Sequence, residues 1–185
     1  MRGTMTSRSK TSRRPGRPPP SRSAARGVEP VRVEIANRQR LVAIDRGWLE
    51  RLVRRAVAAL GAGQAEIGLA IVDDTGIAEL HDRWLGLPDP TDVITFDLGG
   101  PGTAGLHGDI AVSAETARRV ARELGWQPRH ELAYYVVHGL LHLAGEDDLE
   151  PAARRRMRSR ERRVMTAIGL PSPPRRRRPA TRGTR

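Results

Sequence analysis

The chain has 185 residues, 38% of them hydrophobic, with no cysteine and a formal net charge of +12. The length fits one domain with a single core, and the lack of cysteine excludes disulfides and thiolate metal sites, so any metal ion would need nitrogen and oxygen ligands. No apolar run reaches the ~20 residues that span a bilayer and the N-terminus lacks an apolar signal segment, so we expect a soluble protein that is not secreted and has no membrane partner.

The positive charge is concentrated at the two ends of the chain. Residues 1–27 hold eight basic residues and residues 171–185 hold six, with no acid in either, which leaves 19 basic and 21 acidic residues in 28–170. Both ends are rich in Pro, Ser, Gly and Arg and poor in large apolar residues, so we predict disordered basic tails around one folded domain, residues 28–170. Such tails can attract RNA phosphates or simply aid solubility.

The first half of the domain is expected to alternate strands and helices. Apolar residues in alternation predict strands, and apolar residues at helical spacing predict helices. Asp45 and Thr75 are the expected N-caps of the two helices. The expected elements are a strand over 31–35, a helix over 46–60, a strand over 67–72 and a helix from Thr75 to Trp84.

The second half is expected to contain two short strands followed by three helices. Ser113 is the expected N-cap of the first of these helices, and Gly125 the residue that ends it. The last helix contains seven arginines between Arg154 and Arg163. The expected elements are a loop over 87–92, a strand over 93–96, a glycine-rich loop over 99–108, a strand over 109–112, and helices over 114–124, 128–144 and 150–168.

Two histidines on the helix over 128–144 suggest a metal site. His138 and His142 are four residues apart, so they differ by about 40° around the axis and can face one cation. The same pair can also be buried histidines that hydrogen bond to other partners. Gly145 favours the metal interpretation, because a left-handed glycine would end the helix and bring residue 147 or 148 back toward the histidines.

Asp148 is the candidate third ligand. It lies ten residues after His138, the position of the third ligand in HExxHxxGxxH zinc sites, and two imidazoles with one carboxylate would leave a coordination position for water. The alternative is that Asp147, Asp148 and Glu150 only cap the following helix. Zinc peptidases place a glutamate after the first histidine, and Gly139 at that position argues against a peptidase. Asp147 is the candidate carboxylate to assist a nucleophilic water.

Four stretches of the sequence resemble one known family. HGLLHLAGEDD over 138–148 resembles the HGxLHLxGxDH signature of the YbeY family of metal-dependent endoribonucleases. PTDVITF over 90–96 resembles that family's PTDVLSF, and GDIAVS over 108–113 resembles its GDIVIS. Met157 and Glu161 resemble the family's C-terminal pattern, so that the resemblance extends over residues 31–170.

The resemblance implies a compact α+β domain with a mixed sheet of about four strands flanked by helices. It implies one zinc ion at His138, His142 and position 148, although this ligand set also accepts other divalent metals. It further implies a cytoplasmic, single-strand-specific endoribonuclease that acts in 3′-end processing of small-subunit rRNA and in ribosome quality control. The implied partners are rRNA and the small ribosomal subunit, with a ribosomal protein or a GTPase as a candidate protein partner.

Two positions depart from the family pattern. Asp148 replaces the third histidine, and Leu85 stands where the family has an arginine thought to matter for RNA cleavage. Arg83 is the candidate replacement for that arginine, binding phosphate or stabilising charge during cleavage. Thr91 and Asp92 are candidate substrate-binding residues beside the metal, with local turn stabilisation as the alternative.

These departures leave a second function open. An RNA-binding or ribosome-binding assembly factor would keep the fold, with or without the metal, but have little or no nuclease activity, because two working residues are replaced. A metallohydrolase acting on another substrate is a third interpretation.

Overall fold

The computed structural model describes residues 31–100 and 102–174. The predicted N-terminal tail, residues 1–27, lies outside this range, and residues 171–174 of the predicted C-terminal tail belong to no helix or strand. The helices and strands are, in chain order, β1 (Arg32–Asn37), α1 (Arg46–Ala59), β2 (Ala65–Val72), α2 (Asp74–Leu85), β3 (Val93–Asp97), β4 (Leu106–Ser113), α3 (Ala114–Leu124), α4 (Pro128–Leu143) and α5 (Pro151–Ala167).

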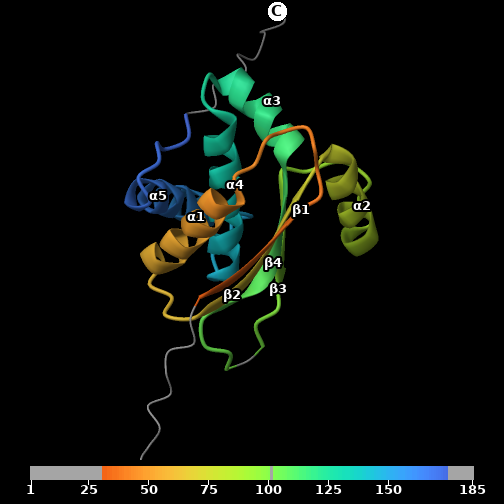
Figure 1. Ribbon diagram of the computed structural model, residues 1–185. Coiled ribbons are helices and arrows are strands. Elements are labelled where there is room, and N and C mark those ends of the chain that lie inside the picture. The colour runs from red at the N-terminus through yellow and green to blue at the C-terminus, as the bar shows by residue number, and fades with distance from the viewer. Residues whose placement is uncertain (1–30, 101, 175–185) are drawn as a thin grey trace, which may run out of the picture.

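The four strands form one mixed sheet in the order β1-β2-β4-β3. β1 and β4 both pair with β2 in parallel, whereas β3 runs antiparallel to β4 at the edge of the sheet. The helices α1, α4 and α5 lie on one side of this sheet, α2 lies on the other, and α3 crosses one end (Figure 1). The prediction of an α+β domain with a mixed sheet of about four strands is therefore confirmed.

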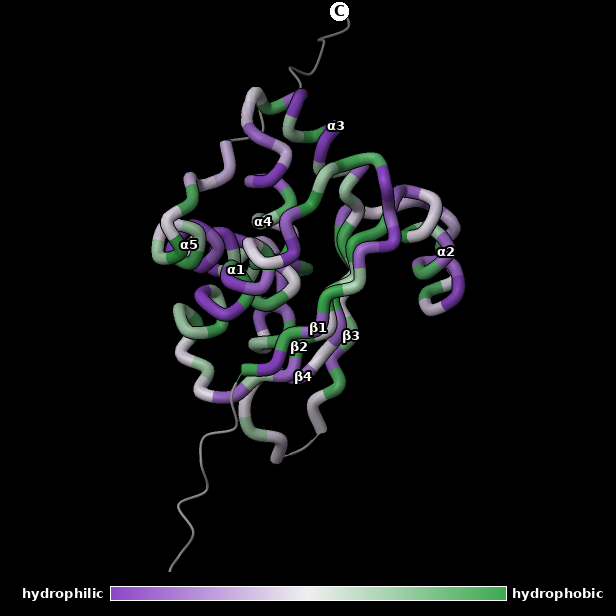
Figure 2. Tube along the Cα trace, viewed as in Figure 1, coloured by the Kyte–Doolittle hydropathy of each residue, from purple (hydrophilic) through white to green (hydrophobic). Residues whose placement is uncertain are grey.

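The main core fills the space between the sheet and the helices α1 and α4. Its fully buried members include Leu49, Ile71, Ile110, Leu140 and Leu141. Figure 2 shows hydrophobic segments along the strands and hydrophilic segments on the outer turn of α2. Within the described residues, no helix has both the length and the apolar character that crossing a bilayer requires.

The helix caps follow the sequence with one exception. The Asp45 carboxylate accepts a hydrogen bond from Trp48 N at 2.9 Å, and the Ser113 hydroxyl accepts one from Thr116 N at 3.0 Å, as predicted for both. The prediction of Thr75 as the cap of α2 is wrong, because Asp73 caps this helix by accepting from Gly76 N at 2.8 Å.

Strand β4 begins earlier than predicted. Its ladder with β2 starts at Leu106, inside the stretch expected to be a glycine-rich loop. A Cβ atom on Gly108 would lie 2.4 Å from the Phe96 carbonyl oxygen and 2.5 Å from Leu143 Cδ2. Glycine at this position therefore permits the close approach of strand and helix and does not mark a turn.

Helix α4 packs tightly against β3 and β4. A Cβ atom on Gly139 would lie 2.9 Å from Ile110 Cγ2 and 3.0 Å from Thr95 Oγ1, so a larger residue would push the helix away from the sheet. The position after the first histidine therefore faces the sheet, and its glycine is explained by packing. This contact fixes the rotation of α4, and with it the direction in which its histidines point.

Candidate functional site

His138 and His142 meet through their Nε2 atoms, which lie 3.0 Å apart. The ring centroids are 4.6 Å apart and the planes cross at 83°. Both side chains are partly buried on α4. We call these two residues the imidazole pair. The prediction that a spacing of four residues brings both rings to one point is confirmed.

Glu161 holds the first imidazole from the neighbouring helix. Its Oε1 atom lies 2.8 Å from His138 Nδ1, and its Oε2 atom accepts a hydrogen bond from the Tyr134 hydroxyl at 3.1 Å. Glu161 is 3% exposed, so this carboxylate on α5 is buried with both oxygens in use. A buried carboxylate needs such partners, because its desolvation is costly otherwise.

The turn after α4 holds the second imidazole. Gly145 has a φ of 82°, and this left-handed residue turns the chain back after the helix, as predicted. The Glu146 carbonyl oxygen then lies 3.0 Å from His142 Nδ1. The Glu146 carboxylate forms an ion pair with Arg160 of α5, which ties the turn to the last helix.

The hydrogen-bond partners assign the protons of the imidazole pair. A carbonyl oxygen can only accept, so His142 carries its proton on Nδ1 and donates it to Glu146. An ionised Glu161 also only accepts, so His138 carries a proton on Nδ1 as well. The two Nε2 lone pairs then face each other, an arrangement that suits a cation held between them. Metal-ligating histidines have this arrangement, with Nδ1–H donated to a carboxylate or a backbone carbonyl.

The structure does not complete the ligand set with Asp148. Among the described residues, no group of three or more His, Cys, Asp or Glu side chains is arranged to hold a metal ion. The half-buried Asp148 accepts a hydrogen bond from Arg154 Nε through its backbone oxygen at 3.0 Å, and its carboxylate makes no hydrogen bond or ion pair with the described residues. Ligation by Asp148 stays a prediction.

The neighbouring carboxylates do not cap α5 through their side chains. The N-cap of this helix is Glu150, which makes no capping hydrogen bond with its side chain. The exposed Asp147 accepts a hydrogen bond from Leu149 N at 3.0 Å, a local turn contact. Its second carboxylate oxygen makes no hydrogen bond with the described residues.

Thr91 and Asp92 form a local turn at the start of β3. Thr91 Oγ1 donates to Asp92 Oδ1 at 3.2 Å, and Val93 N donates to the same oxygen at 3.0 Å, so the predicted alternative of turn stabilisation describes their contacts. The Asp92 carboxylate also acts on Tyr134. Burial raises the pKa of the Tyr134 hydroxyl above its usual value of 10.0, and the charges of Glu161, Glu131 and Asp92 raise this pKa further.

Arg83 and Leu85 lie on the other side of the sheet. Both are exposed in the last turn of α2, and Figure 1 shows α2 and α4 on opposite faces of the sheet. The structure therefore brings neither residue to the imidazole pair. Leu85 is 58% exposed, so its side chain has no packing role that would explain it.

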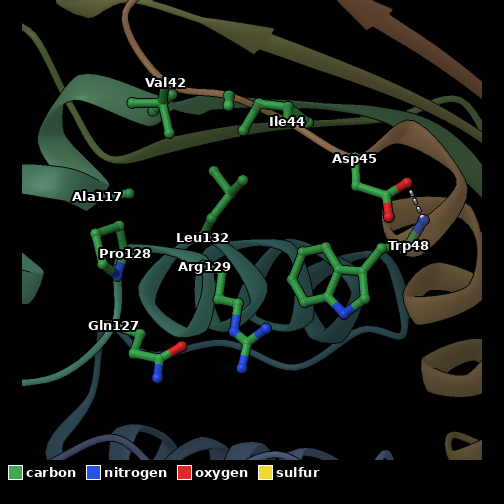
Figure 3. Close-up of a pocket in the computed structure, with 11 residues that line it drawn as sticks. Val42, Ile44, Asp45, Trp48, Ala117, Gln127, Pro128, Arg129 and Leu132 are labelled. Atoms are coloured by element: carbon green, nitrogen blue, oxygen red, sulfur yellow. Dashed lines mark hydrogen bonds between the residues drawn. The ribbon is translucent and has the colours of Figure 1, made fainter.

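A cavity of about 460 Å³ lies at the N-terminal end of α4, away from the imidazole pair. Figure 3 shows Trp48, Leu132 and Pro128 around it, with Arg129 and Gln127 along one side. Neither His138 nor His142 lines this cavity. It is therefore separate from the metal-type geometry described above.

Sequence reasoning had not given roles to Glu161 and Tyr134. A signal for Glu161 was present, because it occupies the buried stripe of α5 between Met157 and Val164 while all other charged residues of that helix lie outside the stripe. An acid in an apolar stripe needs a partner, and His138 is that partner. Tyr134 gave no such signal, since a tyrosine in an apolar helix is usual.

Comparisons with known proteins show the family to which this chain belongs. Residues 34–169 match the model of the family described as endoribonuclease YbeY. A relative from Moorella thermoacetica, named endoribonuclease YbeY, is 40% identical over 133 residues, which are 66% of this chain and 85% of that one. A relative of the same name from Pelotomaculum thermopropionicum is 36% identical over 148 residues, covering 75% and 97% of the two chains. A solution structure of a Thermotoga maritima protein has a TM-score of 0.51 and 26% identity, over 72% of this chain and 89% of that one.

Proposed function

Because this chain belongs to the YbeY family of endoribonucleases, we propose that it is a metal-dependent endoribonuclease that cuts single-stranded RNA during maturation of small-subunit rRNA. The observation that carries the proposal is the imidazole pair, with Nε2 atoms 3.0 Å apart and both Nδ1 atoms held by acceptors. We further propose a cytoplasmic location, the small ribosomal subunit as the site of action, and a ribosomal protein or GTPase as protein partner.

The residues that would hold the metal are His138, His142 and Asp148. Two imidazole nitrogens and one carboxylate suit zinc, although other divalent ions share these preferences. The imidazole pair fits, because its inward-facing Nε2 atoms have no other acceptor or donor than each other among the described residues. The Asp148 carboxylate fits because no described partner competes for it. A bound zinc ion supplies Lewis-acid polarisation of phosphate oxygens and lowers the pKa of water.

The protein's own residues would orient the site and move the proton. Glu161 keeps the His138 ring in one tautomer and one orientation, and Tyr134 keeps the Glu161 carboxylate in place. Asp147, exposed just after the turn at Gly145, is proposed to accept the proton of the attacking water.

The proposed RNA contacts lie further from the imidazole pair. Thr91 and Asp92 are proposed to border the bound RNA, on the side of Tyr134. Arg83, on the opposite face of the sheet, is proposed to bind RNA phosphate at a distance and does not reach the reacting group.

The alternative of an assembly factor without nuclease activity is not favoured. That interpretation depended on the replacement of two family residues, at Leu85 and Asp148. Both Nδ1 atoms of the imidazole pair have a hydrogen-bond acceptor. The relatives that match most of this chain are named as endoribonucleases.

Metal content and cleavage, measured on the same preparation, test the proposal. We expect about one zinc ion per chain by elemental analysis, cutting of a single-stranded rRNA fragment, loss of cutting after chelation and recovery on adding zinc. His138→Ala should lose both metal and cutting. His107→Ala, which removes a histidine of β4 that lies outside the imidazole pair, is the matched control and should keep both. Cutting that survives His138→Ala would contradict the proposal.

A further inference from the structure

We propose that the outer face of α5 binds the phosphate backbone of the RNA substrate through Arg155, Arg158 and Arg162, which we call the arginine stripe. The inference rests on the proposed function for the identity of its ligand. It adds a binding surface on a helix whose other face holds the imidazole pair in place.

The three arginines share one face of the helix. They are spaced three and four residues apart, so they are neighbours on the helix surface. All three are exposed, and none of their guanidinium groups makes a hydrogen bond or an ion pair with the described residues. A strand of RNA that lies along the helix can therefore meet three guanidinium groups in a row, each able to bind a phosphate through two hydrogen bonds.

Two other arginines of α5 are already engaged. Arg154 donates to the backbone oxygens of Asp148 and Leu149, at 3.0 and 3.1 Å, and Arg160 is paired with Glu146. These contacts tie the turn after α4 to the last helix. The arginines of α5 thus fall into one group that binds the protein itself and another, including the arginine stripe, that faces solvent without a partner.

The stripe also lacks the acidic neighbours that some exposed arginines have elsewhere in this protein. Arg54 is paired with Glu50 on α1 at 2.8 Å, and Arg119 with Glu123 on α3 at 3.8 Å. The only acidic residue between Pro151 and Ala167 is Glu161, which is buried against His138.

Like charges three or four residues apart destabilise a helix by about 0.2–0.5 kcal/mol a pair. A bound polyanion would remove this repulsion, whereas a helix that needed only a soluble surface would gain more from interleaved acids.

The position of the stripe suits an RNA that is cut at the imidazole pair. Arg158 precedes Glu161 by three residues, so it lies one helical turn from the carboxylate that contacts His138. Helix α5 packs on α1 and α4, on their side away from the sheet in Figure 1, and the three arginines are exposed among the described residues. RNA held on this face would be kept close to the site of cutting.

The test compares two triple variants of the full chain with the same change of charge. The stripe variant is Arg155→Gln, Arg158→Gln and Arg162→Gln. The control variant is Arg40→Gln, Arg118→Gln and Arg122→Gln, which removes three exposed arginines without described partners from the 38–45 segment and α3. Binding of a labelled single-stranded RNA is measured from 50 to 300 mM KCl, with thermal melting to confirm that both variants fold.

We expect the stripe variant to lower the slope of log affinity against log salt by about 2, since each phosphate contact contributes about 0.7 on a single strand. Its KM for RNA should rise, with kcat unchanged at saturating RNA. The control variant should keep most of the slope. An equal decrease of the salt slope in both variants, or an unchanged slope in the stripe variant, would overturn the inference. Stripe-dependent binding to phosphatidylserine vesicles, with RNA binding intact, would overturn it too, because the face would then serve a membrane surface.

The two proposals fail in different ways. If His138→Ala abolishes cutting and the stripe variant binds RNA normally, only the arginine stripe is wrong. If no preparation cuts RNA but the stripe variant loses its salt slope, the nuclease proposal is wrong and the RNA-binding face remains.

Discussion

The Glu161 carboxylate and the His138 imidazole lie 2.8 Å apart across the interface between α5 and α4. The contact joins a buried acid to a histidine 23 residues earlier in the chain. Because Glu161 fixes which nitrogen of His138 is free to bind a cation, the last helix contributes to the site without supplying a ligand.

Glu161→Gln should weaken zinc binding by about 10- to 100-fold, the usual effect of losing a carboxylate behind a ligating histidine. The amide has nearly the same shape but no charge, so His138 becomes a poorer ligand. Affinity is measured by competition with a coloured chelator, and folding by thermal melting. A variant that binds zinc as tightly as the unmodified protein would show that Glu161 has only a structural role.

Asp148→Ala should lower zinc occupancy and change the free energy of unfolding by less than about 0.5 kcal/mol, since the carboxylate has no described partner to lose. Elemental analysis and urea unfolding measure the two effects.

Asp147→Ala is the companion variant, and should keep its zinc but slow cutting about 100-fold if this carboxylate accepts the proton of water. If Asp148→Ala keeps full zinc occupancy, Asp148 is not a zinc ligand.

Gly139→Ala should destabilise the fold by up to about 2 kcal/mol. Overpacking against Ile110 and Thr95 costs about 1–3 kcal/mol, while alanine gains about 1 kcal/mol in a helix. Gly47→Ala in α1 is the control, because its new methyl group would lie 3.2 Å from the end of the flexible Arg51 side chain and 3.4 Å from Asp45 Oδ1, and would meet no backbone or core atom. That variant should be neutral or more stable. Equal stabilisation of both variants in urea unfolding would show that α4 is not tightly seated on the sheet.

Tyr134→Phe should reduce the loss of stability at alkaline pH. The pKa of Tyr134 is raised in the folded protein, so the hydroxyl is harder to ionise there than in the unfolded chain. The contribution of the Tyr134 hydroxyl to the free energy of unfolding is complete below pH 10. It is lost as the pH rises above that value, by at most about 1.4 kcal/mol for each pH unit. The free energy of unfolding in urea should differ less between pH 8 and pH 11 for Tyr134→Phe than for the unmodified protein. Identical differences would mean that Tyr134 ionises freely in the folded state.

Local signals in the sequence were enough for most of the fold. Asp45 and Ser113 cap their helices as predicted, because each precedes an amphipathic run without a competing cap beside it. Three polar residues in a row, Asp73 to Thr75, all could have capped α2. Which of them caps the helix depends on a distant contact, because the Asp74 carboxylate accepts hydrogen bonds from the hydroxyls of Ser113 and Thr116. A local sequence pattern does not contain that information.

The candidate site was predictable only where it is local. The His138 and His142 spacing and the turn at Gly145 lie within one helix and its end, and the structure has both as predicted. The partners of the two rings come from elsewhere: Glu161 from another helix, and Glu146 through its backbone, which no residue type reveals. The sequence did not predict the early start of β4. Gly108 lies in this strand because a side chain there would clash with Leu143, which is 35 residues away in the chain.

The dependence of His138 on Glu161 has a consequence for the protein during its own synthesis. A nascent chain that has not yet released α5 from the ribosome has both histidines but lacks the acid that orients one of them. The proposed nuclease therefore gains its full site only when translation of the domain is almost finished. A prematurely stopped fragment without α5 would carry both histidines and still lack the carboxylate that orients His138.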